Sequence, residues 1–132
     1  MCNALPGSPN YGVLAFKMGF HGRLFGSLSS STSKAVMKAD VPAFDWPHAQ
    51  SPVYKYPLAD NEEYNRAQDD ASLADARAKI EQWRTEKGCE IVCAIIEPIQ
   101  AEGGDNHISG YFGNGLRKLT KELGIYMIVD EV

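Results

Sequence analysis

Two acidic residues, each at the end of a short apolar run, are the strongest candidates for chemistry in this chain. The apolar run in CAIIEPIQ ends at Glu97, and the run in MIVDEV ends at Asp130. Such runs are typical of buried parallel strands, and the carboxylate that closes each one then lies at the rim of the sheet. Ligands of open α/β sheets bind outside the carboxyl ends of the strands. The sequence therefore predicts that Glu97 and Asp130 lie at one binding crevice.

The two carboxylates suggest different partners. A buried carboxylate is costly unless a cation meets it. A protonated pyridine nitrogen is such a cation, and enzymes that use pyridoxal phosphate (PLP) pair it with an acid. Asp130 either does this or caps a neighbouring helix. Glu97 either binds a basic group or a substrate, or forms a structural ion pair, and Pro98 fixes the chain direction directly after it.

The segment GFHGR, which follows a predicted strand, adds a cation and two rings. The guanidinium of Arg23 presents paired donors that fit a carboxylate. The rings of Phe20 and His21 could stack on a flat cofactor. The alternative is a solvated Arg23 beside a packed Phe20.

A second glycine-containing segment, GGDNH at 103–107, indicates a turn. Gly103 and Gly104 allow positive φ or a close backbone approach. Asp105, Asn106 and His107 are either supporting groups behind a site or ordinary turn residues.

Composition excludes several classes of function. The net charge of −4 gives no general attraction to nucleic acid or to an anionic membrane surface. No apolar run approaches the ~20 residues that a membrane-spanning helix needs. The cysteines, Cys2, Cys89 and Cys93, are odd in number and have no histidine at ligand spacing, so we expect neither a disulfide framework nor a metal site.

Strands and helices alternate in the expected order. The expected elements are a strand over 11–17, a loop with a short helix over 18–31, an ordered surface excursion over 34–60, a helix from Ser72 to Lys87, a strand ending at Glu97, a loop over 102–110, a helix from Asn114 to Leu123 and a strand over 125–130. This order predicts an α/β fold with a mainly parallel sheet flanked by helices.

Each of the two longer helices has an apolar stripe and an end signal. The stripes are Leu73, Ala76, Ile80 and Trp83 in the first helix, and Phe112, Leu116, Leu119 and Leu123 in the second. Ser72 with Asp75 suggests a capping box at the first helix, and Gly88 and Gly124 suggest the two C-terminal ends. Gly113 disfavours the first turn of the second helix, which we therefore expect to begin at Asn114.

Taken together and in this order, the strings FKMGFHGRLFGSLS, VPAFDWP, YPL, EPIQAEGGDNH and IVDEV resemble the class III aminotransferases of PLP fold type I, in particular the branch that acts on 4-aminobutyrate. The resemblance implies transfer of the amino group of 4-aminobutyrate to 2-oxoglutarate, giving succinate semialdehyde and glutamate. Other donors within the class, namely ornithine, acetylornithine and β-alanine, stay open.

The resemblance also implies a role for each candidate residue. Asp130 would pair with the pyridine nitrogen of PLP, and Phe20 would stack on the cofactor ring with His21 in support. Arg23 would bind the carboxylate of 4-aminobutyrate. Glu97 would mask a distant arginine in one half-reaction and release it when 2-oxoglutarate binds.

The resemblance further implies that residues 1–132 are a partial large, PLP-binding domain, truncated at both ends. No lysine in the chain has the context of the family's Schiff-base lysine, so we expect the isolated chain to be inactive, or to be a module that only pairs with a partner subunit. The family implies a homodimer and a soluble intracellular protein, cytoplasmic in fungal-like members and mitochondrial in animal-like members.

Overall fold

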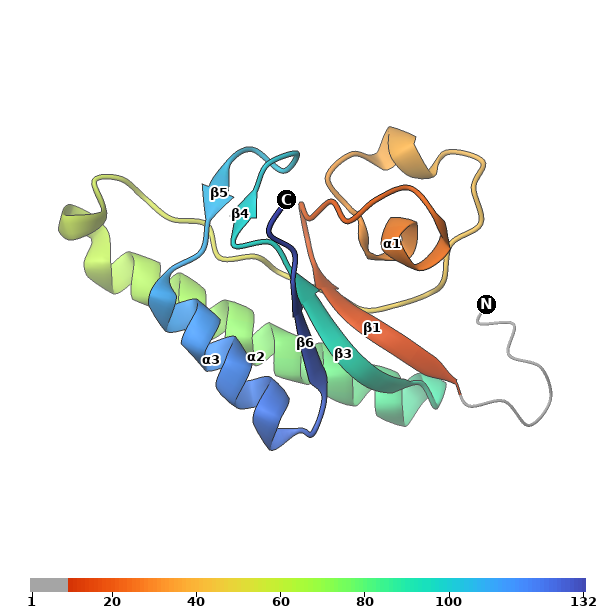
Figure 1. The fold of residues 1–132 in the computed structure, drawn as a ribbon. Coiled ribbons are helices and arrows are strands. Elements are labelled where there is room, and N and C mark those ends of the chain that lie inside the picture. The colour runs from red at the N-terminus through yellow and green to blue at the C-terminus, as the bar shows by residue number, and fades with distance from the viewer. Residues whose placement is uncertain (1–9) are drawn as a thin grey trace.

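A four-stranded parallel sheet forms the centre of the chain (Figure 1). The computed structural model describes residues 10–132. The sheet order is β2 (His48–Ala49), β1 (Tyr11–Phe16), β3 (Glu90–Ile96) and β6 (Tyr126–Val129), and every neighbouring pair is parallel. A two-stranded antiparallel hairpin of β4 (Ile99–Gln100) and β5 (Asn106–His107) stands beyond the end of β3. The predicted α/β fold with a mainly parallel sheet is confirmed.

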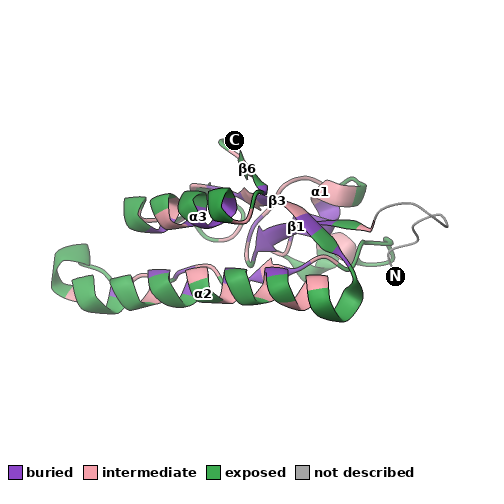
Figure 2. Ribbon diagram, turned by 90° about the horizontal axis from the view of Figure 1, so that it is seen from below, coloured by how far each residue is buried: buried purple, intermediate pink, exposed green. Residues whose placement is uncertain are grey.

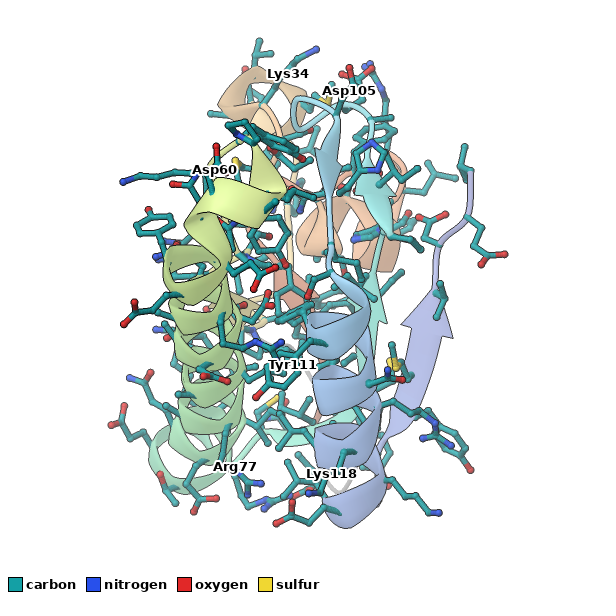
Figure 3. All side chains as sticks on the ribbon, turned by 90° about the vertical axis from the view of Figure 1, so that its left-hand side faces the viewer. Lys34, Asp60, Arg77, Asp105, Tyr111 and Lys118 are labelled. Atoms are coloured by element: carbon teal, nitrogen blue, oxygen red, sulfur yellow. The ribbon has the colours of Figure 1, made fainter. Side chains whose placement is uncertain are left out.

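The long helices α2 (Glu62–Lys87) and α3 (Gly110–Glu122) lie side by side on one face of the sheet (Figures 1 and 3). The buried residues lie where these helices face the strands, and the opposite face of α2 is exposed (Figure 2). The shorter helical segments are α1 (Phe25–Ser30), η1 (Ala35–Lys38) and η2 (Leu58–Asn61). Within residues 10–132, no helix is both long enough and apolar enough to cross a membrane.

The apolar stripes of both helices are confirmed, and they pack against the buried strand residues to form the core. Ala76, Ile80, Phe112 and Leu116 are at most 1% exposed, and the rings of Phe16 and Phe112 pack in a T-shaped arrangement with their centroids 5.6 Å apart. Leu73, Trp83 and Leu123 are partly buried against the same cluster. The two predicted end signals are also correct, because Gly88 and Gly124 both have positive φ, 56° and 67°.

The predicted start of the first helix was wrong by ten residues, because α2 begins at Glu62 instead of at Ser72. Ser72 does not cap a helix; its hydroxyl donates to the carbonyl oxygen of Gln50 at 2.5 Å. The first turns of α2 bury polar side chains, Asn65 and Asp69, against Lys55 and Tyr54 of the excursion. A helix face that meets a polar partner has no apolar periodicity, so the pattern did not reveal it.

The predicted start of the second helix was also wrong, because α3 begins at Gly110. Ser109 is its N-cap, and the Ser109 hydroxyl accepts a hydrogen bond from Phe112 N at 2.9 Å. This cap offsets the weak helix propensity of the glycines that follow. Gly115 has a packing role, since a Cβ at this position would lie 2.5 Å from Leu73 Cδ1 of α2.

The excursion over 34–60 is ordered, as predicted, and it also contains β2, which pairs with the end of β1. The rings of Phe44 and Trp46 stack with their centroids 4.9 Å apart. Asn65 of α2 holds the later part of the excursion, because its amide accepts from Lys55 N and donates to Lys55 O.

Candidate active site

Three adjacent strands, β1, β3 and β6, end at the same edge of the sheet, at the top of Figure 1. Glu97 directly follows β3, and Asp130 directly follows β6. The sheet pairing extends one residue past β6, since Asp130 N donates to Ile96 O at 2.8 Å. Parallel pairing therefore places the two acids on neighbouring strand ends.

The segment Met18–Arg23, which we call the rim loop, follows β1 and lies against both acids. The backbone N–H of Phe20 donates to Glu97 Oε2 at 2.7 Å, and Nδ1 of His21 lies 2.8 Å from Asp130 Oδ2. Two successive residues of one loop thus hold the two acids. The positive φ values of Met18 (65°) and Gly22 (118°) turn the loop back over the sheet edge.

Glu97 is only 7% exposed, yet it has few partners. Its Oε2 accepts the Phe20 hydrogen bond, and Oε1 has no hydrogen bond from any residue in 10–132. Across the same residues, no Lys, Arg or His nitrogen lies within ion-pair distance of Glu97. A buried carboxylate with an open oxygen is suited to receive a cation or a hydrogen-bond donor from a ligand or another segment.

Asp130, like Glu97, has one carboxylate oxygen with a hydrogen bond and one without. Its Oδ2 is held by His21, and Oδ1 has no hydrogen bond within residues 10–132. The Asp130 side chain is 18% exposed, whereas that of His21 is 1% exposed. The open oxygen therefore belongs to a carboxylate that is fixed on one side and accessible at the rim.

Arg23 is exposed, and in the described part of the chain it forms no ion pair or hydrogen bond. The pKa of Glu102 is lowered mainly by the hydrogen bond from Lys34, and the charge of Arg23 contributes to the lowering. The structure thus brings together Phe20, His21, Glu97 and Asp130, but it does not place Arg23 in contact with either acid.

Sequence reasoning did not identify the groups that fix the rim loop from behind. His21 N donates to Ser31 Oγ at 2.8 Å. Gln100 Nε2 donates at 2.9 Å to the carbonyl oxygen of Lys17, the residue directly before the rim loop. A Cβ on Gly103 would lie 2.2 Å from Met18 O, so the hairpin turn requires glycine there. Asn106 Nδ2 lies 4.0 Å from Met18 Sδ, so Gly103 and Asn106 support the loop, whereas the exposed side chain of His107 has no hydrogen bond or ion pair within residues 10–132. No local pattern marks Ser31 or Gln100 as partners of a loop so distant in sequence.

A groove of about 330 Å³ lies away from the rim, between α2, the excursion and the start of α3. Tyr54, Asp69, Arg66, His107 and Tyr111 contribute to its walls. Tyr111 of α3, labelled in Figure 3, donates to Asp70 of α2 at 2.8 Å, and the guanidinium of Arg66 lies 3.6 Å from the centre of its ring.

Asp69 in this groove has both oxygens occupied. Tyr54 OH donates to Asp69 Oδ1, and Ser109 Oγ donates to Oδ2 at 2.7 Å. Burial, with the hydrogen bond to Asp69 second, raises the pKa of Tyr54 to about 12. In residues 10–132, no group of three or more His, Cys, Asp or Glu side chains is placed to hold a metal ion.

Comparison with known proteins points to one family. Residues 7–132 match the family described as "Aminotransferase class-III". Among curated proteins, the chain is 53% identical to 4-aminobutyrate aminotransferase of Kluyveromyces lactis, over all of this chain and 27% of that protein. It is 42% identical to the mitochondrial 4-aminobutyrate aminotransferase of Sus scrofa, over all of this chain and 26% of that protein.

Solved structures agree. Lysine aminotransferase from M. tuberculosis superimposes with a TM-score of 0.82 at 36% identity, covering 92% of this chain and 26% of that one. An (S)-enantioselective omega-transaminase from Thermomicrobium roseum gives a TM-score of 0.72 at 26% identity, with 92% and 26% covered. The chain thus spans about a quarter of the length of these relatives. With the matched residues covering nearly all of it, the chain belongs to the class-III aminotransferase family.

Proposed function

We propose that residues 1–132 form part of the large, PLP-binding domain of an aminotransferase that transfers the amino group of 4-aminobutyrate to 2-oxoglutarate. The products are succinate semialdehyde and glutamate. The family match and the names of the curated relatives support this donor. The observation that carries the proposal is the open Oδ1 of Asp130, which is held at the sheet rim beside the rim loop.

The residues at the rim fit PLP. When bound, PLP supplies a protonated pyridine ring that withdraws electrons from the reacting carbon. A pyridinium needs a fixed anionic acceptor, and Oδ1 of Asp130 is one. It also needs an apolar surface for its face, and the half-buried ring of Phe20 follows directly on a buried glycine in the same loop. Asp130 would therefore hold the pyridine nitrogen, and Phe20 would pack on the ring.

Arg23 and Glu97 have the properties that substrate binding requires. Arg23 presents an exposed guanidinium that no ion pair of residues 10–132 occupies, so a substrate carboxylate can take both donors. Glu97 keeps Oε1 open while Phe20 N fixes Oε2. We assign Arg23 to the carboxylate of 4-aminobutyrate, and Glu97 to the masking of an arginine supplied from outside these residues.

Another amine donor is the main alternative. The similarity to lysine aminotransferase from M. tuberculosis makes lysine a donor to test beside ornithine, acetylornithine and β-alanine. A non-catalytic module that only pairs with an intact subunit is a third possibility. We further propose a homodimer, and either a cytoplasmic or a mitochondrial location, since relatives named as mitochondrial are among the matches.

A segment exchange tests the proposal. Residues 1–132 replace the matching segment of the Kluyveromyces lactis enzyme, which aligns with the whole chain. We expect the chimera to bind PLP and to convert 4-aminobutyrate faster than the other four donors. The isolated chain, which lacks the lysine that anchors the cofactor, should convert none. A chimera that folds and binds PLP but prefers another donor would refute the assignment of substrate, and a folded chimera that takes up no PLP would refute the function itself.

A further inference from the structure

The side chain and the backbone of His21 are both fixed by hydrogen bonds, and the ring is buried. Its side chain is 1% exposed, and Nδ1 lies 2.8 Å from Asp130 Oδ2. Its backbone N–H donates to Ser31 Oγ at 2.8 Å, and the Ser31 hydroxyl in turn contacts Ser27 O at 2.8 Å. A Cβ on Gly19 would lie 3.0 Å from Nε2, so the ring also packs closely on the backbone of its own loop.

This geometry assigns the proton on the ring. A carboxylate oxygen only accepts, so Nδ1 must be the donor, whether the imidazole is neutral or charged. The hydrogen bond takes up Oδ2 of Asp130 and fixes the plane of the carboxylate. Oδ1 is then the oxygen left for a ligand, in a direction that His21 determines.

We propose that His21 is a positioning residue that acts through Asp130, orienting Oδ1 toward the pyridine nitrogen of PLP. This inference rests on the proposed function. His21 does not need to touch the cofactor to have this effect. Because Phe20 N holds Glu97 one residue earlier, the rim loop sets the positions of both acids and of the Phe20 ring together.

The test uses the chimera described above and measures PLP dissociation constants and the absorption spectrum of the bound cofactor. His21→Phe keeps a ring but removes the donor. His21→Asn keeps an amide N–H near the position of Nδ1. Loss of one hydrogen bond to a charged group predicts that PLP binds about tenfold more weakly to His21→Phe. We expect His21→Asn to bind nearly as tightly as the unmodified chimera.

A double-mutant cycle separates positioning from general damage. If His21 acts through Asp130, His21→Phe should weaken PLP binding in the Asp130 background and have almost no effect in the Asp130→Asn background. His107→Phe, on the exposed hairpin strand β5, is the matched control and should leave PLP binding unchanged. The absorption maximum of bound PLP should move in His21→Phe and in Asp130→Asn, but not in His107→Phe.

Three results would overturn the inference: equal PLP affinity in His21→Phe and the unmodified chimera, equal weakening in His21→Phe and His21→Asn, or equal losses in both Asp130 backgrounds. A fall in the thermal stability of the cofactor-free His21→Phe chimera that accounts for the weaker binding would overturn it as well. An unmodified chimera that folds but takes up no PLP would instead refute the proposed function, and this inference with it.

Discussion

Asp69 and Asp130 are both held by neighbouring side chains, but the two sites use their oxygens differently. Asp69 is 2% exposed, and the hydroxyls of Tyr54 and Ser109 occupy its two oxygens. Asp130 gives one oxygen to His21 and keeps the other open at the rim, and Glu97 likewise keeps one oxygen open. A saturated carboxylate joins parts of the fold, whereas a fixed but unsaturated one is available to a ligand.

The difference also concerns what each acid connects. Asp69 joins the excursion, α2 and the cap of α3, so its hydrogen bonds stabilise the packing of the chain. Within residues 10–132, the side chains of Asp130 and Glu97 form hydrogen bonds only with the rim loop. We therefore expect loss of Asp69 to lower stability and loss of Asp130 to lower ligand binding.

The largest effect is expected for Asp130→Asn in the chimera. Removal of the anionic partner of a desolvated cation predicts a loss of transamination on the order of a thousandfold. The free energy of unfolding of the chain should change by less than about 0.5 kcal/mol, because the amide retains the shape of the side chain. Steady-state kinetics and urea unfolding measure the two quantities. A large loss of stability with little loss of activity would contradict the prediction, because Asp130 would then serve the fold instead of the ligand.

A smaller effect is expected for Asp69→Ala, and it concerns folding stability instead of activity. This change leaves the Tyr54 and Ser109 hydroxyls without their acceptor, and it should lower the free energy of unfolding by about 3 kcal/mol. Asp70→Ala is the control, since Asp70 is exposed and its side chain bonds only to Tyr111 among residues 10–132, and a loss of about 0.5 kcal/mol is expected there. Urea unfolding of both variants checks the prediction, and equal losses in the two would contradict it.

The smallest expected effect is on how the free energy of unfolding depends on pH. The pKa of Tyr54 is raised from its ordinary value of 10.0 to about 12 in the folded chain. The folded state therefore keeps the phenol proton that the unfolded state releases, so this contribution is complete below pH 10 and is lost as the pH rises toward 12. Unfolding of the parent and of Tyr54→Phe, compared from pH 8.5 to about 11.5, should show a difference that shrinks with pH. A constant difference would show that the phenol does not titrate in this way.

The sequence was sufficient to predict that Glu97 and Asp130 lie at one edge of the sheet, because both follow apolar strands and parallel strands end at the same edge. It was not sufficient for Asp69, which lies in the polar half of α2, where no periodicity marks a buried face. β2 was missed for a similar reason, since two residues in a proline-rich excursion carry no strand pattern. The pairing of His21 with Asp130 joins residues 109 positions apart, and only the fold brings them together.

A crystal structure of the chimera with PLP tests the central claim most directly. The account predicts that Asp130 Oδ1 lies within about 3 Å of the pyridine nitrogen while Oδ2 stays on His21 Nδ1. A pyridine nitrogen that faces a different group, or an Asp130 side chain turned toward bulk water, would contradict it.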